Sequence, residues 1–529
     1  MNHIFASLLM FALFAVFAPL LEAQDQIRDL VVKIHAVHQR PDVLRPWTRN
    51  SPQKVSGSGV VIEGKRILTN AHVVRYASQI YVQPNQSANR IPARVEGIAP
   101  SIDLAVLSIG DEKFFEGRGS LPFADELPRV KDTVNVYGYP TGGTELSVTQ
   151  GIVSRIEFND YYYQTSGLRI QVDAALNFGN SGGPAVSDGK LVGLVFSLIQ
   201  NAQNIGYLIP VEEIRLFLAD IADRVYHGKP QIYDFLQTVE NDALRRRLGL
   251  PPGINGVMVA DPYRMDPQYP LQEWDVIVKI GDTPIDSDGK VAVRYDLRLS
   301  ALYLVQKYAK NGQVDLTIFR DGQLKNINFP LEPRRELVVP YLLHKRPRYF
   351  ISGPLVFSQA TQDYLERLGS QRALSLSQQS SPLITRRFDK PTFPGEELVV
   401  VSSPLFPHRI TKGYDDPNYA VLSQVNGVQV QNLRHLVETL RDTNVPQITF
   451  KFARASKLTH ETMVFERAEL LEATNKILEE NGIRSPYSSD LRSVWEKSVS
   501  AVPAPVHGAC CAVYSPKVAP LTTPAEQVP

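Results

Sequence analysis

Between residues 24 and 224 the chain is divided into many short apolar runs, and glycine-containing turns separate them. Typical runs are 31–34, 60–62 and 170–172. Short strands punctuated in this way are typical of antiparallel barrels and sandwiches. A helix-like stretch at 211–226 closes the region, and residues 227–230 look like a linker. The sequence therefore predicts one mainly β domain over residues 24–228.

Two later segments resemble each other and indicate a duplicated module of about 100 residues. Each has a strand, a tight turn and a second strand, followed later by an alternating strand. The matching segments are 275–285 with 314–320, and 421–430 with 447–452. The strand at 314–320 ends at Asp321-Gly322, a dipeptide typical of hairpin turns. We expect the two modules to occupy residues 229–334 and 335–470.

The N-terminal residues 1–23 differ from the rest, because residues 4–21 form an almost continuous apolar run. The small Ala23 precedes polar residues, which is typical of a secretory signal cleaved after Ala23. The apolar run could also span a bilayer as an uncleaved anchor. Cleavage would leave no stable membrane span. Either alternative places the body of the protein outside the cytoplasm, and we expect secretion across a membrane into the periplasm.

The C-terminal residues 471–529 are expected to be a helical extension and a disordered tail. The tail carries six prolines between Pro503 and Pro529 and too little apolar surface to order itself. Its adjacent Cys510 and Cys511 are the only cysteines. A bridge between neighbours closes a strained ring, so the sequence predicts no disulfide framework.

The charge balance excludes several classes of partner. The 56 lysines and arginines nearly cancel the 55 acidic residues, which argues against nucleic-acid binding. No glycine-rich phosphate loop of the Gly-x-x-x-x-Gly-Lys-Ser/Thr type is present. His460-Glu461 is not followed by a second histidine at metal-binding spacing. We therefore expect no cofactor and no catalytic metal.

The string Gly179-Asn180-Ser181-Gly182-Gly183 contains a candidate nucleophile. Flanking glycines allow the backbone to turn so that the amides of Gly179 and Ser181 point at one spot, where they could stabilise an oxyanion. A glycine-rich surface turn is the alternative for such a string. Two further motifs favour the catalytic interpretation.

These motifs supply a candidate base and a candidate orienting acid. His72 follows a β-like run at 66–69, and Asp103 precedes the apolar strand 104–107. A partly buried carboxylate needs a partner, and accepting the Nδ1 proton of His72 would satisfy it while fixing the tautomer of the ring. A structural histidine and a turn aspartate are the alternatives for each residue alone. Together with Ser181, they predict a catalytic triad.

These three motifs and their spacing resemble the Deg/HtrA family of serine proteases. The resemblance extends to Gly57-Ser58-Gly59, 150–154 and 204–210. In the modules, 353–357 and 424–430 resemble the plant branch with two PDZ domains. The resemblance implies a mainly β fold, in which a chymotrypsin-like double β-barrel is followed by two PDZ domains, each an α+β partly open barrel.

The resemblance also assigns further site residues. Gly179, Asn180 and Ser181 would frame the oxyanion hole. Segment 194–199 would form the wall beside which the substrate lies as an added strand, with an aliphatic side-chain pocket. The substrate-binding residues expected there are Leu194, Val195, Phe196 and Ile205.

A PDZ module binds a chain end by strand addition beside a carboxylate-binding loop. In the first module the candidate loop consists of Tyr233, Asp234, Phe235 and Leu236. In the second it is 353–357, where Pro354 removes one amide donor. We therefore expect the first module to bind peptide C-termini, and the second to serve assembly.

The family resemblance implies ATP-independent proteolysis of unfolded or damaged proteins by a homo-oligomer, a trimer or a multiple of trimers. A rival hypothesis is a chaperone or binding protein whose protease fold is held inactive. Phe178 supports the rival, because the family usually has a small residue or proline there. A third alternative is a scaffold in which the PDZ modules matter more than catalysis.

Overall fold

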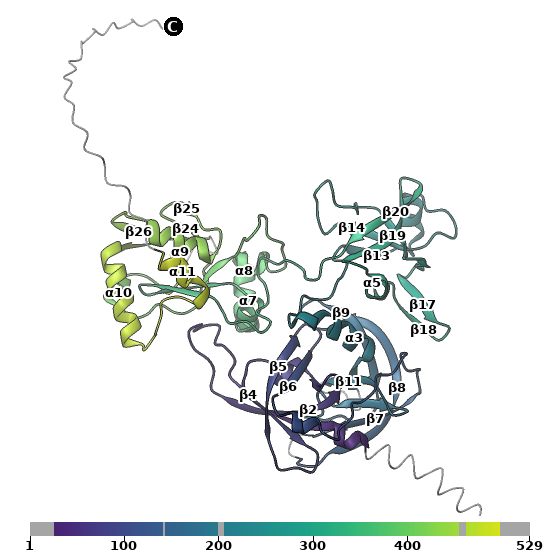
Figure 1. Cartoon of the computed structure of the whole chain (residues 1–529). Helices are drawn as coiled ribbons and strands as arrows, with labels where there is room; N and C mark the ends of the chain where they lie inside the picture. The colour runs from purple at the N-terminus through teal and green to yellow at the C-terminus, as the bar shows by residue number, and fades with distance from the viewer. Residues whose placement is uncertain (1–25, 141–142, 199–205, 454–461, 498–529) are drawn as a thin grey trace, which may run out of the picture.

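The computed structural model describes residues 26–140, 143–198, 206–453 and 462–497. Two six-stranded barrels occupy the N-terminal half, and two smaller modules lie above them in Figure 1. No helix within the described ranges is long and apolar enough to cross a membrane. The expected signal or anchor segment, the proline-rich tail and both cysteines lie outside the described residues.

Each barrel is a closed antiparallel sheet. The first has the order β1-β2-β3-β6-β5-β4, and the second β10-β11-β12-β9-β8-β7. The strands of the first barrel are β1 (Val31–His38), β2 (Gln53–Ile62), β3 (Arg66–Thr69), β4 (Ala77–Pro84), β5 (Ile91–Ala99) and β6 (Leu104–Ile109). Those of the second are β7 (Thr133–Gly138), β8 (Ser147–Asp160), β9 (Ser166–Val172), β10 (Pro184–Ser187), β11 (Lys190–Leu198) and β12 (Gly206–Pro210). The predicted chymotrypsin-like double barrel is confirmed.

The barrels share a hydrophobic core with the helix that follows them, α3 (Val211–Asp220). Val32 and Leu107 of the first barrel belong to the same buried cluster as Leu194 of the second barrel and Phe217 of α3. The short helix α2 (Ala71–Val74) follows β3 at the edge of this cluster, which also contains Val73. This packing fixes the end of β3 close to the second barrel.

The middle module is built around one antiparallel sheet with the order β13-β14-β15-β19-β20. Its elements are β13 (Phe235–Thr238), α4 (Asp242–Leu248), β14 (Val257–Asp261), β15 (Val276–Ile280), β16 (Thr283–Pro284), the hairpin β17 (Lys290–Arg294) and β18 (Leu297–Ser300), α5 (Tyr303–Tyr308), β19 (Gln313–Arg320) and β20 (Gln323–Pro330). The predicted hairpin turn at Asp321-Gly322 is confirmed, since both residues have positive φ and Arg320 pairs with Gln323.

The last module has two small sheets, β21-β22-β23 and β25-β24-β26-β27. Its strands are β21 (Tyr349–Ser352), β22 (Leu355–Gln359), β23 (Val399–Val401), β24 (Leu422–Val425), β25 (Val428–Gln429), β26 (Gln447–Phe452) and β27 (Thr462–Glu466). Its helices are α6 (Gln362–Glu366), α7 (Gly369–Gln378), α8 (Pro382–Thr385), α9 (Leu433–Asp442), α10 (Arg467–Glu480) and α11 (Arg492–Trp495). Short 3-10 turns complete the chain at Glu112–Phe115, Ile221–Asp223, Arg409–Thr411 and Ser489–Leu491.

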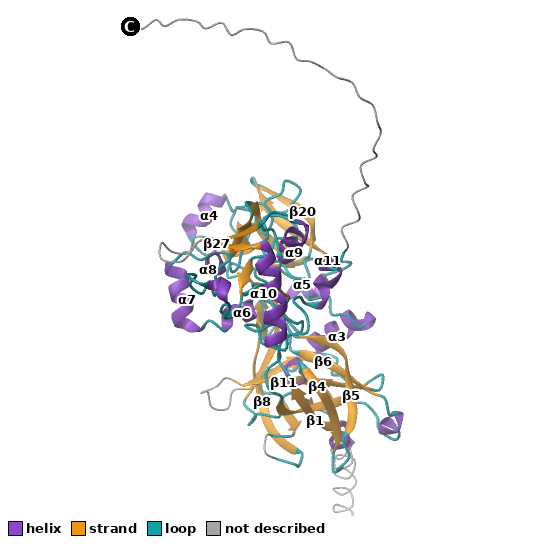
Figure 2. Cartoon of the chain, turned by 90° about the vertical axis from the view of Figure 1, so that its left-hand side faces the viewer, coloured by secondary structure: helices purple, strands orange, loops and turns teal. Residues whose placement is uncertain are grey.

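The helical stretch after residue 470 packs within the last module. Ala473 and Ile477 of α10 are buried, and Leu491 and Val494 belong to the same hydrophobic cluster as Phe450. Figure 2 shows α9, α10 and α11 together above the barrels. Residues 471–497 therefore contribute to the core of this module, although the sequence suggested a separate extension.

A buried ion pair joins the linker before the middle module to the second barrel. Lys229 Nζ lies 2.8 Å from Glu213 Oε2 and 2.7 Å from the Ser166 carbonyl oxygen. Glu213 Oε1 also accepts a hydrogen bond from the Leu168 amide. The side chains of Glu213 and Lys229 are 0% and 6% exposed. Burial lowers the pKa of Lys229, and Glu213 opposes that effect. The linker is thus anchored to the second barrel through Lys229.

Replacing Lys229 by methionine is expected to lower the free energy of unfolding by about 3 kcal/mol, because the Glu213 carboxylate then stays buried without its cation. Lys190→Met is the matched control, since Lys190 pairs with Asp125 at the surface. It should change stability by less than about 1 kcal/mol. Urea denaturation measures both values. Equal losses would contradict the role given to the buried pair.

Candidate active site

The structure pairs His72 with Asp103 at the edge of the first barrel. His72 Nδ1 lies 2.7 Å from Asp103 Oδ2, and the His72 amide donates to Oδ1 at 2.8 Å. The Asp103 carbonyl oxygen accepts from the Ala71 amide and from Asn70 Nδ2. A carboxylate only accepts hydrogen bonds, so we assign the ring proton to Nδ1. This leaves Nε2 free to accept a proton.

Asp103 holds this geometry with an uncommon backbone. Its φ is +55°, a left-handed conformation that aspartate tolerates better than most residues. Its side chain is only 3% exposed, whereas that of His72 is 46% exposed. The carboxylate is therefore screened from solvent while the far edge of the imidazole remains accessible.

Two opposing effects set the pKa of His72. Burial lowers it, but the charge of Asp103 and its hydrogen bond raise it, and the net pKa is raised above 6.5. A raised pKa makes His72 a stronger base, and requires a higher pH to keep the imidazole neutral.

The backbone of Ser181 and Val73 of the His72 helix both lie close to Gly57. A Cβ atom on Gly57 would lie 2.7 Å from Val73 Cγ1 and 3.2 Å from the Ser181 carbonyl oxygen. The Ser58 amide donates to that same oxygen at 2.8 Å. The structure thus brings the three predicted triad residues to one region. Within the described part of the chain, the Ser181 hydroxyl makes no hydrogen bond.

The loop before Ser181 leaves two backbone donors open. The amides of Gly182 and Gly183 bond to the carbonyl oxygens of Val195 and Asn180. Those of Gly179 and Ser181 have no acceptor among the described residues. The carbonyl oxygen of Gly179 is held by Ser58 Oγ at 2.8 Å, and Gly179 has φ +98°. This arrangement suits an oxyanion hole.

Close packing explains the glycine after Ser181. A Cβ on Gly182 would lie 2.2 Å from the Ser58 carbonyl oxygen and 2.4 Å from Thr69 Oγ1, and its φ is +84°. Asn180 is 3% exposed, and its Oδ1 has no hydrogen-bond partner in the part of the chain that the structure describes. The Asn180 amide donates to the Asn177 carbonyl oxygen at 3.1 Å, and its carbonyl oxygen accepts from the Gly183 amide, so Asn180 holds the turn of the loop and its amide is not an open oxyanion donor.

The residues expected to form the substrate wall lie mainly in the cores. Leu194 and Phe196 belong to the cluster that joins the barrels, and Val195 belongs to that of the second barrel. The Val195 amide pairs with Gly183. Their contact with substrate stays a prediction, and Ile205 lies outside the described residues.

The two candidate peptide-binding loops differ. In the first, Phe235 is 63% exposed and begins β13, which is the edge strand of its sheet. Asp234 is buried and accepts hydrogen bonds from the Tyr263 amide and the Tyr269 hydroxyl. Tyr233 packs on Tyr263, with ring centroids 5.4 Å apart, and Leu236 packs against the core. The free edge of β13 offers a place for strand addition.

The corresponding loop of the last module is closed. β22 pairs with both β21 and β23. The Gly353 amide donates to Thr474 Oγ1 at 2.6 Å, and a Cβ on Gly353 would lie 2.4 Å from Leu470 Cδ1. Helix α10 therefore covers the amide that a peptide carboxylate would need.

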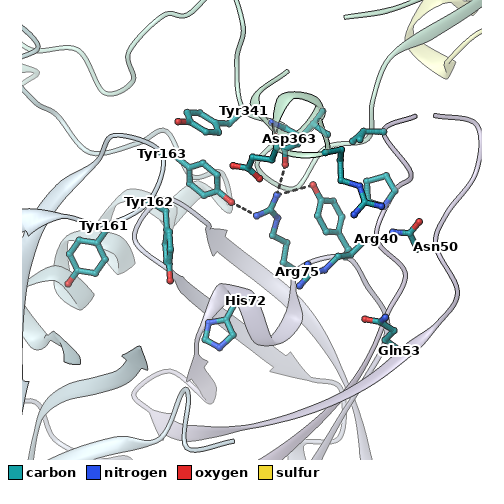
Figure 3. A pocket seen from close by; sticks show the side chains of 16 residues that line it. Arg40, Asn50, Gln53, His72, Arg75, Tyr161, Tyr162, Tyr163, Tyr341 and Asp363 are labelled. Carbon is teal, nitrogen blue, oxygen red and sulfur yellow. Dashed lines mark hydrogen bonds and ion pairs between the residues drawn. The ribbon is translucent and has the colours of Figure 1, made fainter. Parts of the chain in front are cut away.

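Sequence reasoning missed the surroundings of His72. A pocket of about 690 Å³ extends from His72 to residues of the last module (Figure 3). Its lining includes Arg75, Tyr162, Tyr163 and Asp363. The run of three tyrosines at 161–163 was a visible signal, but nothing in the sequence linked it to residues about 200 positions away.

Two closed barrels with a histidine, an aspartate and a serine where they meet define the class of chymotrypsin-like serine proteases. The family model of the trypsin-like peptidase domain matches residues 57–194. The model of the PDZ domain matches residues 338–490.

Similarity over nearly the whole chain then defines the family. Protease Do-like 4, mitochondrial, of Arabidopsis thaliana is 35% identical over 466 residues, which cover 87% of this chain and 85% of that protein. Protease Do-like 2, chloroplastic, of the same organism is 34% identical over 88% of this chain and 75% of its own. The solved structure of the HtrA-type protease AlgW with decapeptide matches 59% of this chain and 98% of its own, with 25% identity and a TM-score of 0.45. The chain belongs to the Deg/HtrA family of Do-like serine proteases.

The raised pKa of His72 predicts a pH profile. Cleavage needs a neutral base, so the acid limb of kcat/KM should have its midpoint above pH 6.5. Asp103→Asn removes the largest influence that raises this pKa, so the midpoint should fall while the rate drops about 10³-fold or more. Asp188→Asn, in an exposed turn, is the control and should change neither the midpoint of the acid limb nor the rate of cleavage. An unchanged midpoint in Asp103→Asn would contradict the pairing.

Proposed function

We propose that the chain is an endopeptidase that degrades unfolded or damaged proteins without ATP. Ser181 is the nucleophile, His72 the general base and Asp103 the group that orients the base. The observation that carries this proposal is the pairing of His72 with a buried Asp103 beside the loop of Ser181. Membership of the Do-like proteases supports it.

The chemistry follows from the atoms in place. His72 Nε2 takes the proton of Ser181 Oγ as this oxygen attacks the scissile carbonyl carbon. The amides of Gly179 and Ser181 stabilise the oxyanion, an effect of roughly 3–4 kcal/mol per donor in tested enzymes. The imidazolium then protonates the leaving amine, and water hydrolyses the acyl-enzyme with His72 again as base. Asn180 holds the turn of the oxyanion loop through its backbone hydrogen bonds.

We divide the chain into a protease domain at 24–228, a first PDZ domain at 229–334 and a second PDZ domain from 335. The open edge of β13 supports binding of peptide C-termini to the first PDZ domain. The covered loop at Gly353 supports a role in assembly for the second, in a homo-oligomer built of trimers. Unfolded polypeptides are the substrates.

The proposed location is a compartment reached across a membrane. The apolar run at 4–21 supports it, either as part of a signal cleaved after Ala23 or as an anchor. A periplasmic location fits this route. Two relatives bear the names mitochondrial and chloroplastic, so an organelle is the other compartment that fits.

A catalytically restrained chaperone is the second candidate. Two observations favour it. Phe178 is 68% exposed in the loop before Ser181, and the Ser181 hydroxyl makes no hydrogen bond within the described chain. In that case the fold would bind unfolded chains without cleaving them.

Organophosphate labelling separates the two functions. We expect one label per chain, on Ser181, and cleavage of reduced casein in nucleotide-free buffer. Ser181→Ala should abolish the label and lower the cleavage rate by at least about 10⁴-fold. Ser120→Ala, at an exposed loop serine, should behave as the parent protein does. Casein binding without label or cleavage would support the chaperone instead, and a label that survives Ser181→Ala would refute the nucleophile.

A further inference from the structure

The second PDZ domain is docked beside His72 by contacts on several sides. Arg75, three residues after His72, donates to Asp363 of α6 at 3.3 Å and to the Tyr163 hydroxyl. The Tyr76 hydroxyl donates to the Leu343 carbonyl oxygen at 3.1 Å. The rings of Tyr163 and Tyr341 meet edge to face, with centroids 4.8 Å apart. These contacts join residues that are up to 288 positions apart.

The loop between β1 and β2 anchors the same docking. Val43 is buried in a hydrophobic cluster whose other members, such as Leu342 and Tyr364, belong to the second PDZ domain. Trp47 packs on Tyr349 and Phe406, with ring centroids 6.2 and 5.7 Å away. Hydrophobic and aromatic contacts of this kind hold the domain against the protease.

The docked domain borders an open pocket beside His72. The pocket of about 690 Å³ has His72 on one side and α6 on the other (Figure 3), and its volume lies within the range of binding pockets, about 300–1,000 Å³. Residues of the protease and of the second PDZ domain line it together. A polypeptide that reaches His72 on this side meets the second domain as well.

The charges that line the pocket are not balanced. Arg75 and Asp363 pair with each other. Arg40 and Arg367 line the pocket, and neither forms an ion pair within the described chain. Glu366 is the remaining acid there, and burial, followed by the nearby Asp363, raises its pKa. The lining therefore carries at least one excess positive charge.

We propose that this pocket is an extended substrate subsite that takes an aspartate or glutamate side chain of the polypeptide, and that Arg40 and Arg367 determine this specificity. The second PDZ domain supplies one wall of the subsite through α6. The inference rests on the proposed peptidase function and adds a substrate preference to it. Because the cations are partly exposed, their attraction for the substrate is screened by salt.

Paired quenched-fluorescence peptides test the preference. Each pair differs only in carrying Glu or Gln at one position, and the position is scanned along both sides of the cleaved bond. At low salt we expect kcat/KM to be about five-fold higher for the Glu peptide than for the Gln peptide at one or two positions. A ratio of this size corresponds to the free energy of one partly screened ion pair. The double variant Arg40→Gln/Arg367→Gln should bring this ratio to about one. Arg94→Gln, an exposed arginine of β5 outside the pocket, should leave it unchanged.

Asp363→Asn tests the contribution of the second domain. It removes the charge that pairs with Arg75, so the Glu/Gln ratio should rise above that of the parent protein. A ratio of one at every position, a preference for lysine, or a ratio that the double variant does not lower would overturn the inference, while cleavage of the Gln peptides would still support the peptidase. Failure to cleave any peptide, together with failure of organophosphate labelling, would overturn both.

Discussion

The contact between the two barrels at Ser58 constrains the rest of the site. Its amide holds the Ser181 carbonyl oxygen, and its hydroxyl holds that of Gly179. The neighbouring Gly57 has no side chain, so β2 can lie close to both Val73 and the Ser181 carbonyl oxygen. The nucleophile loop of one barrel is therefore positioned by a strand of the other. Strand β2 thus contacts both the proposed oxyanion loop and the helix of His72.

Much of the fold and of the site could be predicted because the signals are local. Gly-Asn-Ser-Gly-Gly requires positive φ at two glycines, and Gly182 leaves no room for a Cβ. The Asp321-Gly322 turn is likewise encoded by two adjacent residues. The docking of the last module could not be predicted, because Arg75 and Asp363 have unremarkable sequence contexts and lie far apart in the sequence. The packing of α10 into that domain also depends on distant partners such as Gly353.

The middle and last modules use their contacts with the protease differently. The first is joined by its linker, through Lys229, and by Tyr303 and Gln306 of α5, which donate to Glu212 of α3. Among the described residues, no strand pairs with the outer side of its edge strand β13. The second has a covered peptide loop and faces the pocket of His72. This arrangement leaves an open strand edge on the first module for the proposed binding of a chain end, and places the second beside the pocket of His72.

The central claim is that His72 and Ser181 act on one bound substrate, although they belong to different barrels. A peptidyl chloromethyl ketone tests it directly, since its carbonyl reacts with a serine Oγ and its methylene carbon then alkylates a histidine nitrogen held beside it. Mass spectrometry of the treated protein should find His72 as the alkylated histidine, and Ser181→Ala should remove most of that modification. Alkylation of a different histidine, or equal alkylation of His72 in the Ser181→Ala protein, would contradict the account.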